Sequence, residues 1–488
     1  MAPTEPFLRS PPFPWVSEAV AAVACPGTSA ISDPVGLLVK LREARVGGAF
    51  WLSGPRNPWH GTEAVRAHPA DDRAIAAWLC DRPVHAPRGG PVPDGVLADA
   101  ALTRIAASAY RDPFTGRTTS PVAAIAILAE WRDQLLANRE IGVAVGMAAW
   151  KRDAIAQFLW DGTRSPRFLP PARAGERPGA VAYWPSRAPV GFAEDLVRRG
   201  HGAWPVEDGF LRSSGLGAEC RPPMSVIVDR TGGIYFDPSR ASELETILLS
   251  ADFDAPLLAR AARLREAIVA ARLGKYGVDP APAAELRLPQ RRRVVLVVGQ
   301  VDDDLSVIRG GAGVPGNAAF LARVREEEPD AFVLYRPHPD VAAGLRRGRV
   351  ADPVAAGLAD RVVTGGSLLA LVERVDALHV LSSLTGFEAL LRGREVIVHG
   401  QPFYAGWGLT RDLAPAVPRR GRQLPLDALV AGALILAPRY RDPVTLLPCP
   451  PEVLVARLAA GEAEHESALT GLRRAYGRTR ASLAAGAA

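Results

Sequence analysis

Five polar residues that could bind or transform a ligand stand at or close to the ends of short apolar runs. They are Glu207 and Asp208, His338, and Ser382 and Ser383. The apolar runs at 203–206, 331–335 and 377–381 predict strands of an α/β sheet, and ligands bind at the carboxyl ends of such strands. A carboxylate can act there as a nucleophile, and an imidazolium can protonate a leaving group. The alternative for Glu-Asp-Gly is a plain turn with a helix cap.

The stretch around the two serines predicts a strand, a helix, a second strand and a loop. Ser382 and Ser383 stand at the start of the helix, and Gly393 ends it. A helix that begins with hydroxyl groups and free N–H groups after a buried strand suits a phosphate. The next strand, at 395–398, is followed by GQPFYAGWG, whose three glycines among aromatic residues predict close approach to a ligand. Gln401 and Tyr404 lie in this loop.

Several strings of residues, in order along the chain, resemble the bacterial capsule-polysaccharide β-Kdo transferases of the KpsC type. The strings are VEDGFLRS at 206–213, LGKYG at 273–277, YRPHPD at 335–340, and the GFEALLRG and GQPFYAGWGLT runs at 386–393 and 400–410. The resemblance covers residues from about 140 to 447. It implies a GT-B glycosyltransferase: an α/β protein with two Rossmann-like domains, here preceded by a mostly helical remnant of another module.

The resemblance also implies a reaction. A retaining transferase of this type moves Kdo from CMP-β-Kdo to a Kdo-bearing phospholipid in capsule linker synthesis, by double displacement through an aspartate. The reacting carbon is a ketal carbon that carries a carboxylate, so the site must stabilise charge on the departing phosphate and bring a carboxylate to that carbon. No cofactor or metal is required. Asp302-Asp303-Asp304 is expected to cap a helix or contact the sugar instead of holding a cation.

Roles for individual residues follow from the same resemblance. Asp208 is the expected nucleophile, with Glu207 as the alternative, and Arg212 is expected to pair with the Kdo carboxylate. His338 is expected to assist departure of the phosphate. The expected donor-binding residues are Arg336, Ser382, Ser383, Gln300, Gln401 and Tyr404.

Four segments are predicted along the chain. They are an N-terminal segment at 1–138, an acceptor-side Rossmann-like domain with the nucleophile at 139–285, a CMP-sugar-binding domain at 286–420 and a C-terminal helical tail at 421–488. The sequence Tyr-Arg-Asp-Pro occurs at both 110–113 and 440–443, each time between two apolar helices. This repeat predicts that residues 1–138 are the tail of a lost first module. The sequence Arg-Ala-His-Pro at 66–69 is similar to Arg-Pro-His-Pro at 336–339. It lacks a preceding strand, so His68 is interpreted as part of a surface turn.

The hydrophobic pattern predicts further elements. In the first half these are a helix at 149–159, a strand at 181–186, a helix at 194–199, strands at 225–228 and 234–236, and a helix at 256–272. In the second half they are a strand at 293–298, which is apolar enough to be buried on both faces, and helices at 317–325 and 364–374. A basic amphipathic helix is expected beyond Gly461, either on a membrane surface or in solvent.

Composition excludes several classes of protein. The net charge is +6, but only three of the 58 basic residues are lysines, so 55 are arginines, and they are scattered among alanine, glycine and proline. Basicity alone argues weakly for nucleic acid, and no nucleic-acid-binding signature occurs. The four cysteines lack the spacing of a zinc site or a disulfide framework. The N-terminus lacks the pattern of a signal peptide, which predicts a cytoplasmic location. The resemblance to the β-Kdo transferases implies a peripheral position on the inner face of the inner membrane, beside other capsule biosynthesis and export proteins.

A second hypothesis from another class remains open. The chain could be a scaffold of the capsule assembly complex that binds the CMP-sugar without turning it over. The intact Glu-Asp-Gly, His-Pro and Ser-Ser sequences argue against it, and release of CMP from CMP-Kdo would decide between the two.

Overall fold

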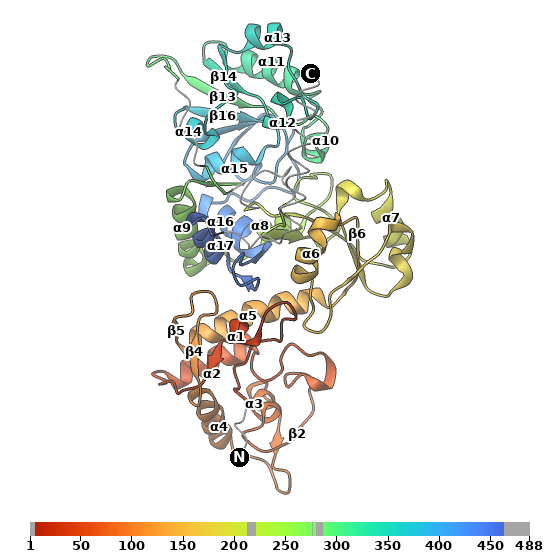
Figure 1. Cartoon of the computed structure of the whole chain (residues 1–488), viewed down its shortest axis with the longest axis vertical. Coiled ribbons are helices and arrows are strands. Elements are labelled where there is room, and N and C mark those ends of the chain that lie inside the picture. Colours follow the sequence, from red (N-terminus) through yellow and green to blue (C-terminus); the bar gives the residue numbers. More distant parts are fainter. Residues whose placement is uncertain (1–4, 212–220, 276, 280–285, 463–488) are drawn as a thin grey trace. The chain divides into compact units, whose positions relative to one another are not determined.

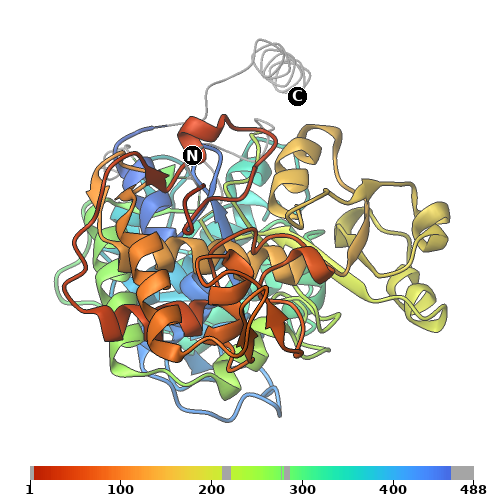
Figure 2. The same ribbon diagram turned by 90° about the horizontal axis from the view of Figure 1, so that it is seen from below.

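The computed structural model describes residues 5–211, 221–275, 277–279 and 286–462, and the chain forms two compact units (Figures 1 and 2). Unit 1 comprises residues 1–142, 153–167 and 440–453, and unit 2 comprises 143–152, 168–439 and 454–488. The boundaries of these units differ from those of the four predicted segments, because residues 153–167 and 440–453 pack with the N-terminal part of the chain. The predicted Arg212 and the basic helix beyond Gly461 lie outside the described residues.

The second Rossmann-like domain is built on a parallel sheet in unit 2. Its strands lie in the order β15-β14-β13-β16-β17-β18, which in chain order is 3-2-1-4-5-6, the order of the Rossmann fold. Their bounds are β13 (Val294–Val298), β14 (Phe332–Arg336), β15 (Arg361–Val362), β16 (Ala377–Val380), β17 (Glu395–Val398) and β18 (Arg411–Asp412). Every residue of β13 is buried, as its apolar sequence predicts. The strand order reverses between β13 and β16.

Helices cover both faces of this sheet. Figure 1 shows α11 (Asn317–Glu327) and α13 (Asp352–Leu358) on one side, and α14 (Leu368–Val372) and α15 (Leu384–Leu391) on the other. Phe320 and Val324 of α11 pack with Val295 and Val333 of the strands in one apolar core. Helix α14 is shorter than the predicted 364–374. It begins after Ser367, whose hydroxyl oxygen accepts a hydrogen bond from the Ala370 N–H.

The first Rossmann-like domain contains neighbouring strands in the order β10-β9-β8-β6. Their bounds are β6 (Ile141–Val145), β8 (Ala180–Tyr183), β9 (Ala203–Asp208) and β10 (Ser225–Val228). Strand β9 is parallel to β8 and antiparallel to β10. The predicted strand at 234–236 is wrong. The Ile234 carbonyl instead accepts a hydrogen bond of 2.9 Å from the Asp237 N–H, which closes a turn.

The three predicted helices of this region are present with small shifts. They are η2 (Ala149–Lys151) continuing into α6 (Arg152–Phe158), α7 (Phe192–Arg198) and α9 (Ala255–Ala270). Helix α8 (Glu243–Ser250) was not predicted. After α9, the Gly-Lys-Tyr-Gly sequence lies in a short hairpin of β11 (Leu273–Gly274) and β12 (Gly277–Val278). Helices α10 (Leu305–Gly310), α12 (Pro339–Ala342) and α16 (Leu426–Val430), and the π-helix η6 (Ala431–Leu436), also belong to unit 2. No helix in the described ranges is long and apolar enough to span a bilayer.

Unit 1 contains both copies of the Tyr-Arg-Asp-Pro repeat, and the two copies fold alike. Each forms a hairpin, β4 (Ala109–Arg111) with β5 (Thr118–Thr119), and β19 (Pro438–Arg441) with β20 (Pro448–Cys449). In each, the aspartate N–H donates to the carbonyl five residues later, and the aspartate carbonyl accepts from the N–H four residues later. The aspartates, Asp112 and Asp442, also accept from the N–H groups two and three residues later. The sequence repeat is therefore a structural repeat.

The remaining elements of unit 1 are helical or short. They are α1 (Glu18–Ala21), β1 (Ala24–Cys25), α2 (Pro34–Ala44), η1 (Gly54–Arg56), β2 (Val65–Arg66), α3 (Asp72–Leu79), β3 (Val84–His85), α4 (Asp94–Ala106) and α5 (Pro121–Asn138). The mostly helical N-terminal segment is thus present as predicted. A boundary between the units falls within β7 (Arg167–Phe168) and another within α17 (Pro451–Ala459). In unit 2, η3 (Pro171–Glu176) comes shortly after β7, and η4 (Pro185–Arg187) follows β8.

Candidate functional site

Asp208, the expected nucleophile, is the last residue of β9 and is held by a lysine. Lys151 Nζ lies 2.8 Å from Asp208 Oδ1 and 3.0 Å from Oδ2. Both side chains are buried, with relative exposures of 7% and 8%. The ammonium also lies 3.5 Å from the centre of the Trp184 ring, in cation–π geometry. Lys151 follows β6 and Trp184 follows β8, so three neighbouring strands deliver these groups to the edge where α/β sheets bind ligands.

Glu207 differs from Asp208 in direction. Successive side chains of a strand point to opposite faces, so the two carboxylates of β9 do not project to the same side. Glu207 Oε1 accepts a hydrogen bond of 3.1 Å from the Asp208 N–H. This geometry favours Asp208 over Glu207 as the carboxylate beside Lys151.

Gln300 and Ser382 meet at the point where the strand order of the second domain reverses. Gln300 Oε1 accepts a hydrogen bond of 2.9 Å from the Ser382 N–H, and Gln300 Nε2 donates one of 3.1 Å to Ser382 Oγ. The Gln300 backbone is fixed by Asn317, whose side chain accepts from the Gln300 N–H and donates to the Gln300 carbonyl. Dinucleotides and nucleotides bind at such switch points in α/β proteins.

Ser383 caps the helix that begins at this point, as predicted. Its hydroxyl oxygen accepts from the Thr385 N–H at 3.2 Å at the start of α15. The Tyr404 hydroxyl lies behind the cap and donates to the Ser383 carbonyl at 2.5 Å. A Cβ atom at Gly386 would lie 2.2 Å from the Tyr404 hydroxyl oxygen, so glycine is required for this approach. Tyr404 is fully buried and therefore positions the helix instead of contacting a ligand as expected.

His338 stands at the end of β14 and caps the short helix α12. Its Nδ1 accepts a hydrogen bond of 3.2 Å from the Asp340 N–H. This bond requires an unprotonated Nδ1, so the proton of the neutral ring lies on Nε2. Burial lowers the pKa of His338, the Asp340 carboxylate raises it, and the nearby Lys275 ammonium lowers it further. In the free protein His338 is therefore suited to donate a hydrogen bond from Nε2, instead of a proton from an imidazolium.

Arg336 and Gln401 hold loops around the site. The Arg336 guanidinium donates to the carbonyls of Val363 at 3.3 Å and Gly366 at 3.0 Å, and also to that of Gly365. The Gln401 N–H donates to the Gly310 carbonyl at 2.7 Å, and its side-chain amide donates to Pro415. Both side chains donate hydrogen bonds to backbone carbonyls, and the contacts of Arg336 and Gln401 with the sugar donor stay predictions.

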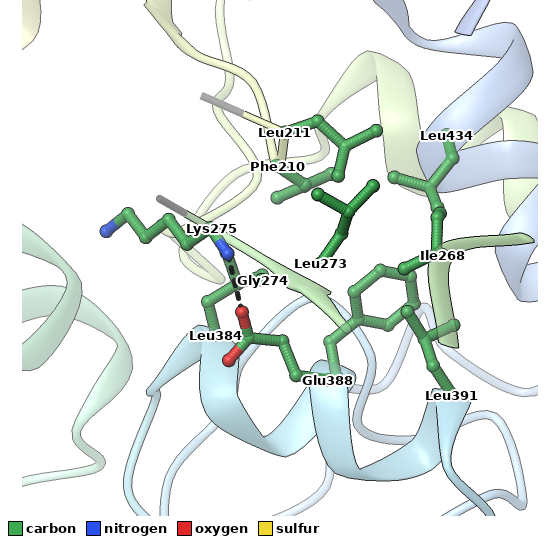
Figure 3. A pocket seen from close by; sticks show the side chains of 11 residues that line it. Phe210, Leu211, Ile268, Leu273, Gly274, Lys275, Leu384, Glu388, Leu391 and Leu434 are labelled. Atoms are coloured by element: carbon green, nitrogen blue, oxygen red, sulfur yellow. Dashed lines mark hydrogen bonds between the residues drawn. The ribbon is translucent and has the colours of Figure 1, made fainter. Parts of the chain in front are cut away.

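Lys275 enters the site from the β11–β12 hairpin. Its backbone N–H donates at 2.7 Å to the buried carboxylate of Glu388 on α15, whose pKa is raised by burial. Figure 3 shows the Lys275 side chain extending away from the apolar residues that line the adjoining pocket. That pocket, lined by residues such as Leu273, Leu384 and Leu391, has a cavity volume of about 10 Å³. It can hold about one water molecule and is no substrate site.

Contacts within unit 2 connect the Asp208 and Ser382 sites. Phe210, two residues after Asp208, stacks on Phe403 with ring centres 4.3 Å apart, and its ring centre is 6.0 Å from that of Phe387 on α15. The Tyr235 hydroxyl donates to the Asp208 carbonyl at 3.3 Å.

A second connection passes through Gly310. A Cβ atom at Gly310 would lie 3.2 Å from the Phe236 carbonyl oxygen and 3.5 Å from Ser382 Cβ. These contacts link the segments that follow β9 and β10 in the first domain to α10, α15 and the loop after β17 in the second, all within unit 2.

The three consecutive aspartates, Asp302 to Asp304, make different contacts. Asp304 caps α10, Asp303 pairs with Arg346 at 3.0 Å, and Asp302 accepts a hydrogen bond from Asn317. The described part of the chain contains no group of three or more acidic, histidine or cysteine side chains that could hold a metal ion. The helix cap predicted for this sequence is present. His68 is exposed, and its Nδ1 accepts from the Ala70 N–H, as in a surface turn.

Lys151, Lys275 and Tyr235 were not predicted as site residues. A signal existed for the two lysines, because they are two of only three in a chain that otherwise uses arginine. A position that keeps lysine against this bias favours a compact ammonium over a guanidinium. No sequence signal indicated Tyr235.

Comparison with known proteins places the chain among capsule proteins. The family model described as "Capsule polysaccharide biosynthesis protein" matches residues 179–440, more than half of the chain. The chain is 36% identical over 365 residues to the capsule polysaccharide modification protein LipA of Neisseria meningitidis, covering 72% of this chain and 50% of LipA. It is 41% identical over 313 residues to the lipopolysaccharide-processing protein LpsZ of Rhizobium meliloti, covering 62% of this chain and 70% of LpsZ. The chain spans about half the length of the LipA proteins it matches.

Two solved structures from Thermosulfurimonas dismutans are similar. One is the KpsC β-Kdo 2,7 transferase, with a TM-score of 0.55 and 28% identity over 66% of this chain and 100% of that one. The other is the KpsC β-Kdo 2,4 transferase, with a TM-score of 0.57 and 31% identity over 65% of this chain and 98% of that one. The α/β fold with two Rossmann-like domains is thus of the GT-B type, with an added N-terminal helical region. The chain belongs to the capsule polysaccharide biosynthesis protein family, in its KpsC-type branch.

Proposed function

We propose that this chain is a retaining β-Kdo transferase of capsule linker synthesis, which uses CMP-β-Kdo as donor and a Kdo-bearing phospholipid as acceptor. The observation that carries the proposal is the buried carboxylate of Asp208, fixed by Lys151 at the end of β9. It lies in the same unit as a helix N-terminus equipped with Ser382, Ser383 and Gln300. Similarity to the two KpsC structures supports the sugar and the reaction class.

The first step is a displacement at the anomeric carbon. An Asp208 oxygen forms a bond to that carbon, the bond from the carbon to the phosphate oxygen breaks, and its electron pair leaves with CMP. No proton moves, because the carboxylate attacks in its ionised form. His338 Nε2–H, the Ser383 hydroxyl and the Lys275 ammonium stabilise the charge that develops on the phosphate.

The second step reverses the first with a different oxygen. A hydroxyl of the acceptor attacks the anomeric carbon, the bond to Asp208 breaks, and the Asp208 carboxylate returns. The hydroxyl proton passes to the phosphate of CMP. Two displacements give net retention of configuration. Metal is not required in this scheme, because protein cations and N–H groups face the phosphate. Activity that is unaffected by EDTA is the expected result.

One experiment tests the proposal. The purified chain is incubated with CMP-Kdo and a synthetic Kdo-lipid, and the products are analysed by mass spectrometry and linkage analysis. We expect lipid extended by one or more Kdo residues in β linkage, together with equimolar CMP. A chain that binds CMP-Kdo and releases no CMP would instead be a non-catalytic scaffold of the capsule assembly and export complex.

The proposed acceptor is a lipid, so we also propose that the chain works at the cytoplasmic face of the inner membrane, as a peripheral protein beside other capsule proteins. Cosedimentation with vesicles that contain the Kdo-lipid is the measurement. Equal binding to vesicles with and without the acceptor would contradict acceptor-directed docking.

A further inference from the structure

Lys151 holds a position that the reaction scheme does not yet use. Its ammonium contacts both oxygens of Asp208, and the ring of Trp184 covers it. Charges buried this deeply are normally paired, and such a pair contributes little net stability compared with an apolar pair of similar shape. A purely structural role therefore gives no reason for the pair to lie at the carboxyl ends of three neighbouring strands.

The chemistry at Asp208 changes the charge that Lys151 faces. Before the first displacement Asp208 is a carboxylate, and afterwards it is a neutral ester of the sugar. The sugar brings its own carboxylate on the carbon that forms this ester bond. That carboxylate is separated from the Asp208 oxygen by the anomeric carbon alone, so an ammonium that touches the oxygen can reach the carboxylate with little movement.

We propose that Lys151 is the group that recognises the carboxylate of the sugar acid: it orients Asp208 before attack and pairs with the substrate carboxylate once Asp208 becomes an ester. The inference rests on the proposed function. It gives this site its selectivity for a 2-keto sugar acid, since a neutral sugar brings no carboxylate to replace that of Asp208 beside the ammonium. Lys151 keeps its proton throughout, so the bonds made and broken remain those at the anomeric carbon.

The type of side chain fits this double use. An ammonium is a compact charge with three rotatable donors, whereas a guanidinium presents its donors in a fixed planar fork. A compact donor can turn from one carboxylate to another without moving its chain. Trp184 stabilises the positive charge from one side through its ring and cannot compete as a hydrogen-bond acceptor.

The test compares two variants that cannot turn over the donor. In Asp208→Asn the carboxylate is gone and Lys151 remains. In the double variant Asp208→Asn with Lys151→Met both charges of this ion pair are removed together, and circular dichroism checks that each variant is folded. Titration calorimetry measures the affinity of each variant for CMP-Kdo and for CMP. We expect the double variant to bind CMP-Kdo at least about tenfold more weakly than Asp208→Asn, while the two bind CMP within about twofold.

A structural role alone would change both affinities by the same factor, and that result overturns the inference. It is also overturned if Asp208→Asn binds CMP-Kdo no more tightly than CMP. Arg265→Met is the matched control, because it removes a partly buried cation from its ion pair with Asp427, between α9 and α16. We expect it to leave the ratio of the two affinities unchanged.

Failure of the proposed function gives a different result. The proposed transferase activity is refuted if the wild-type protein neither releases CMP from CMP-Kdo nor acquires a Kdo adduct. If the wild-type protein does both, and the Lys151→Met variant forms the adduct at the same rate, only the proposed role of Lys151 is refuted. If Lys151 acts as inferred, adduct formation in that variant slows by about a hundredfold or more, while Arg265→Met forms the adduct at the wild-type rate.

Discussion

The Tyr404 hydroxyl donates a hydrogen bond to the Ser383 carbonyl, and both groups are held at the N-terminus of α15. The loop that follows β17 is thereby tied to the helix that follows β16. Burial raises the pKa of the Tyr404 hydroxyl well above its usual value, so it remains a donor throughout the physiological range. The aromatic loop thus fixes the position of the helix N–H groups.

Tyr404→Phe is expected to lower both stability and donor affinity. The Ser383 carbonyl keeps its second partner, the Gly386 N–H, so the loss of one hydrogen bond costs about 1 kcal/mol. CMP affinity should fall because the helix N-terminus is less well fixed. Tyr110→Phe is the control, since the buried Tyr110 hydroxyl donates to the Ile105 carbonyl in unit 1. A similar loss of stability without loss of CMP affinity is expected there, and unchanged CMP affinity in Tyr404→Phe would refute this role.

Asp208→Asn is expected to abolish transfer and to leave CMP affinity nearly unchanged, because the amide cannot attack the anomeric carbon. Glu207→Gln, on the opposite face of β9, should retain adduct formation. Peptide mass spectrometry after incubation with CMP-Kdo alone locates the adduct. An adduct on Glu207, or normal turnover in Asp208→Asn, would reverse the assignment.

Ser383→Ala and His338→Ala are each expected to weaken CMP binding and slow donor cleavage, since both groups stabilise the same phosphate charge. The matched control is Ser367→Ala. Ser367 caps α14 in the same domain, and its hydroxyl accepts from the Ala370 N–H at 2.9 Å. Both serine variants should lose about 1 kcal/mol of stability with the cap. CMP affinity should fall in Ser383→Ala only; an equal fall in both would mean that the effect is structural.

The sequence predicts the elements that depend on local pattern. The buried strand β13, the strand that delivers Asp208 and the serine cap of α15 were all predicted, because apolar runs and capping residues act within a few positions of the chain. The partner of Asp208 was not predicted. Lys151 lies 57 positions away, and only the packing of β6, β8 and β9 brings the two together. The burial of Tyr404 was missed for the same reason.

The stability of unit 2 is expected to fall as the pH drops below about 6.5, because two buried histidines must be neutral. His379 Nδ1 and His399 Nε2 are 3.0 Å apart, and His379 Nε2 is 3.6 Å from a Glu328 oxygen. Burial lowers the pKa of His379 to about 3 and that of His399 to about 4. Between pH 6.5 and about 4 the unfolded chain binds these protons and the folded chain does not, so stability falls with pH.

Each histidine should contribute up to about 1.4 kcal/mol per pH unit in this window. Urea unfolding at several pH values measures the slope. His379→Gln should reduce it, whatever its stability at neutral pH, and His68→Gln, at an exposed position of unit 1, should not. An unchanged slope in His379→Gln would show that other groups dominate acid unfolding.

The final prediction concerns the number of linkages that this polypeptide makes. The two similar KpsC structures are named for different linkages, 2,7 and 2,4, and this chain spans about half of the LipA proteins. Residues 1–138 supply the Tyr-Arg-Asp-Pro hairpin but no Glu-Asp-Gly sequence and no strand-borne Arg-Pro-His-Pro. We therefore expect these residues to form no second donor site.

Residues 1–138 instead pack within unit 1, where the buried Trp131 indole N–H donates to the Pro448 carbonyl at 2.7 Å. We expect the purified chain to make a single type of β-Kdo linkage, and deletion of residues 1–138 to lower soluble yield without changing that linkage. Linkage analysis of products made by the full chain and by Asp208→Asn is the measurement. Two alternating linkages from the full chain, or any linkage that survives in Asp208→Asn, would require a second active site.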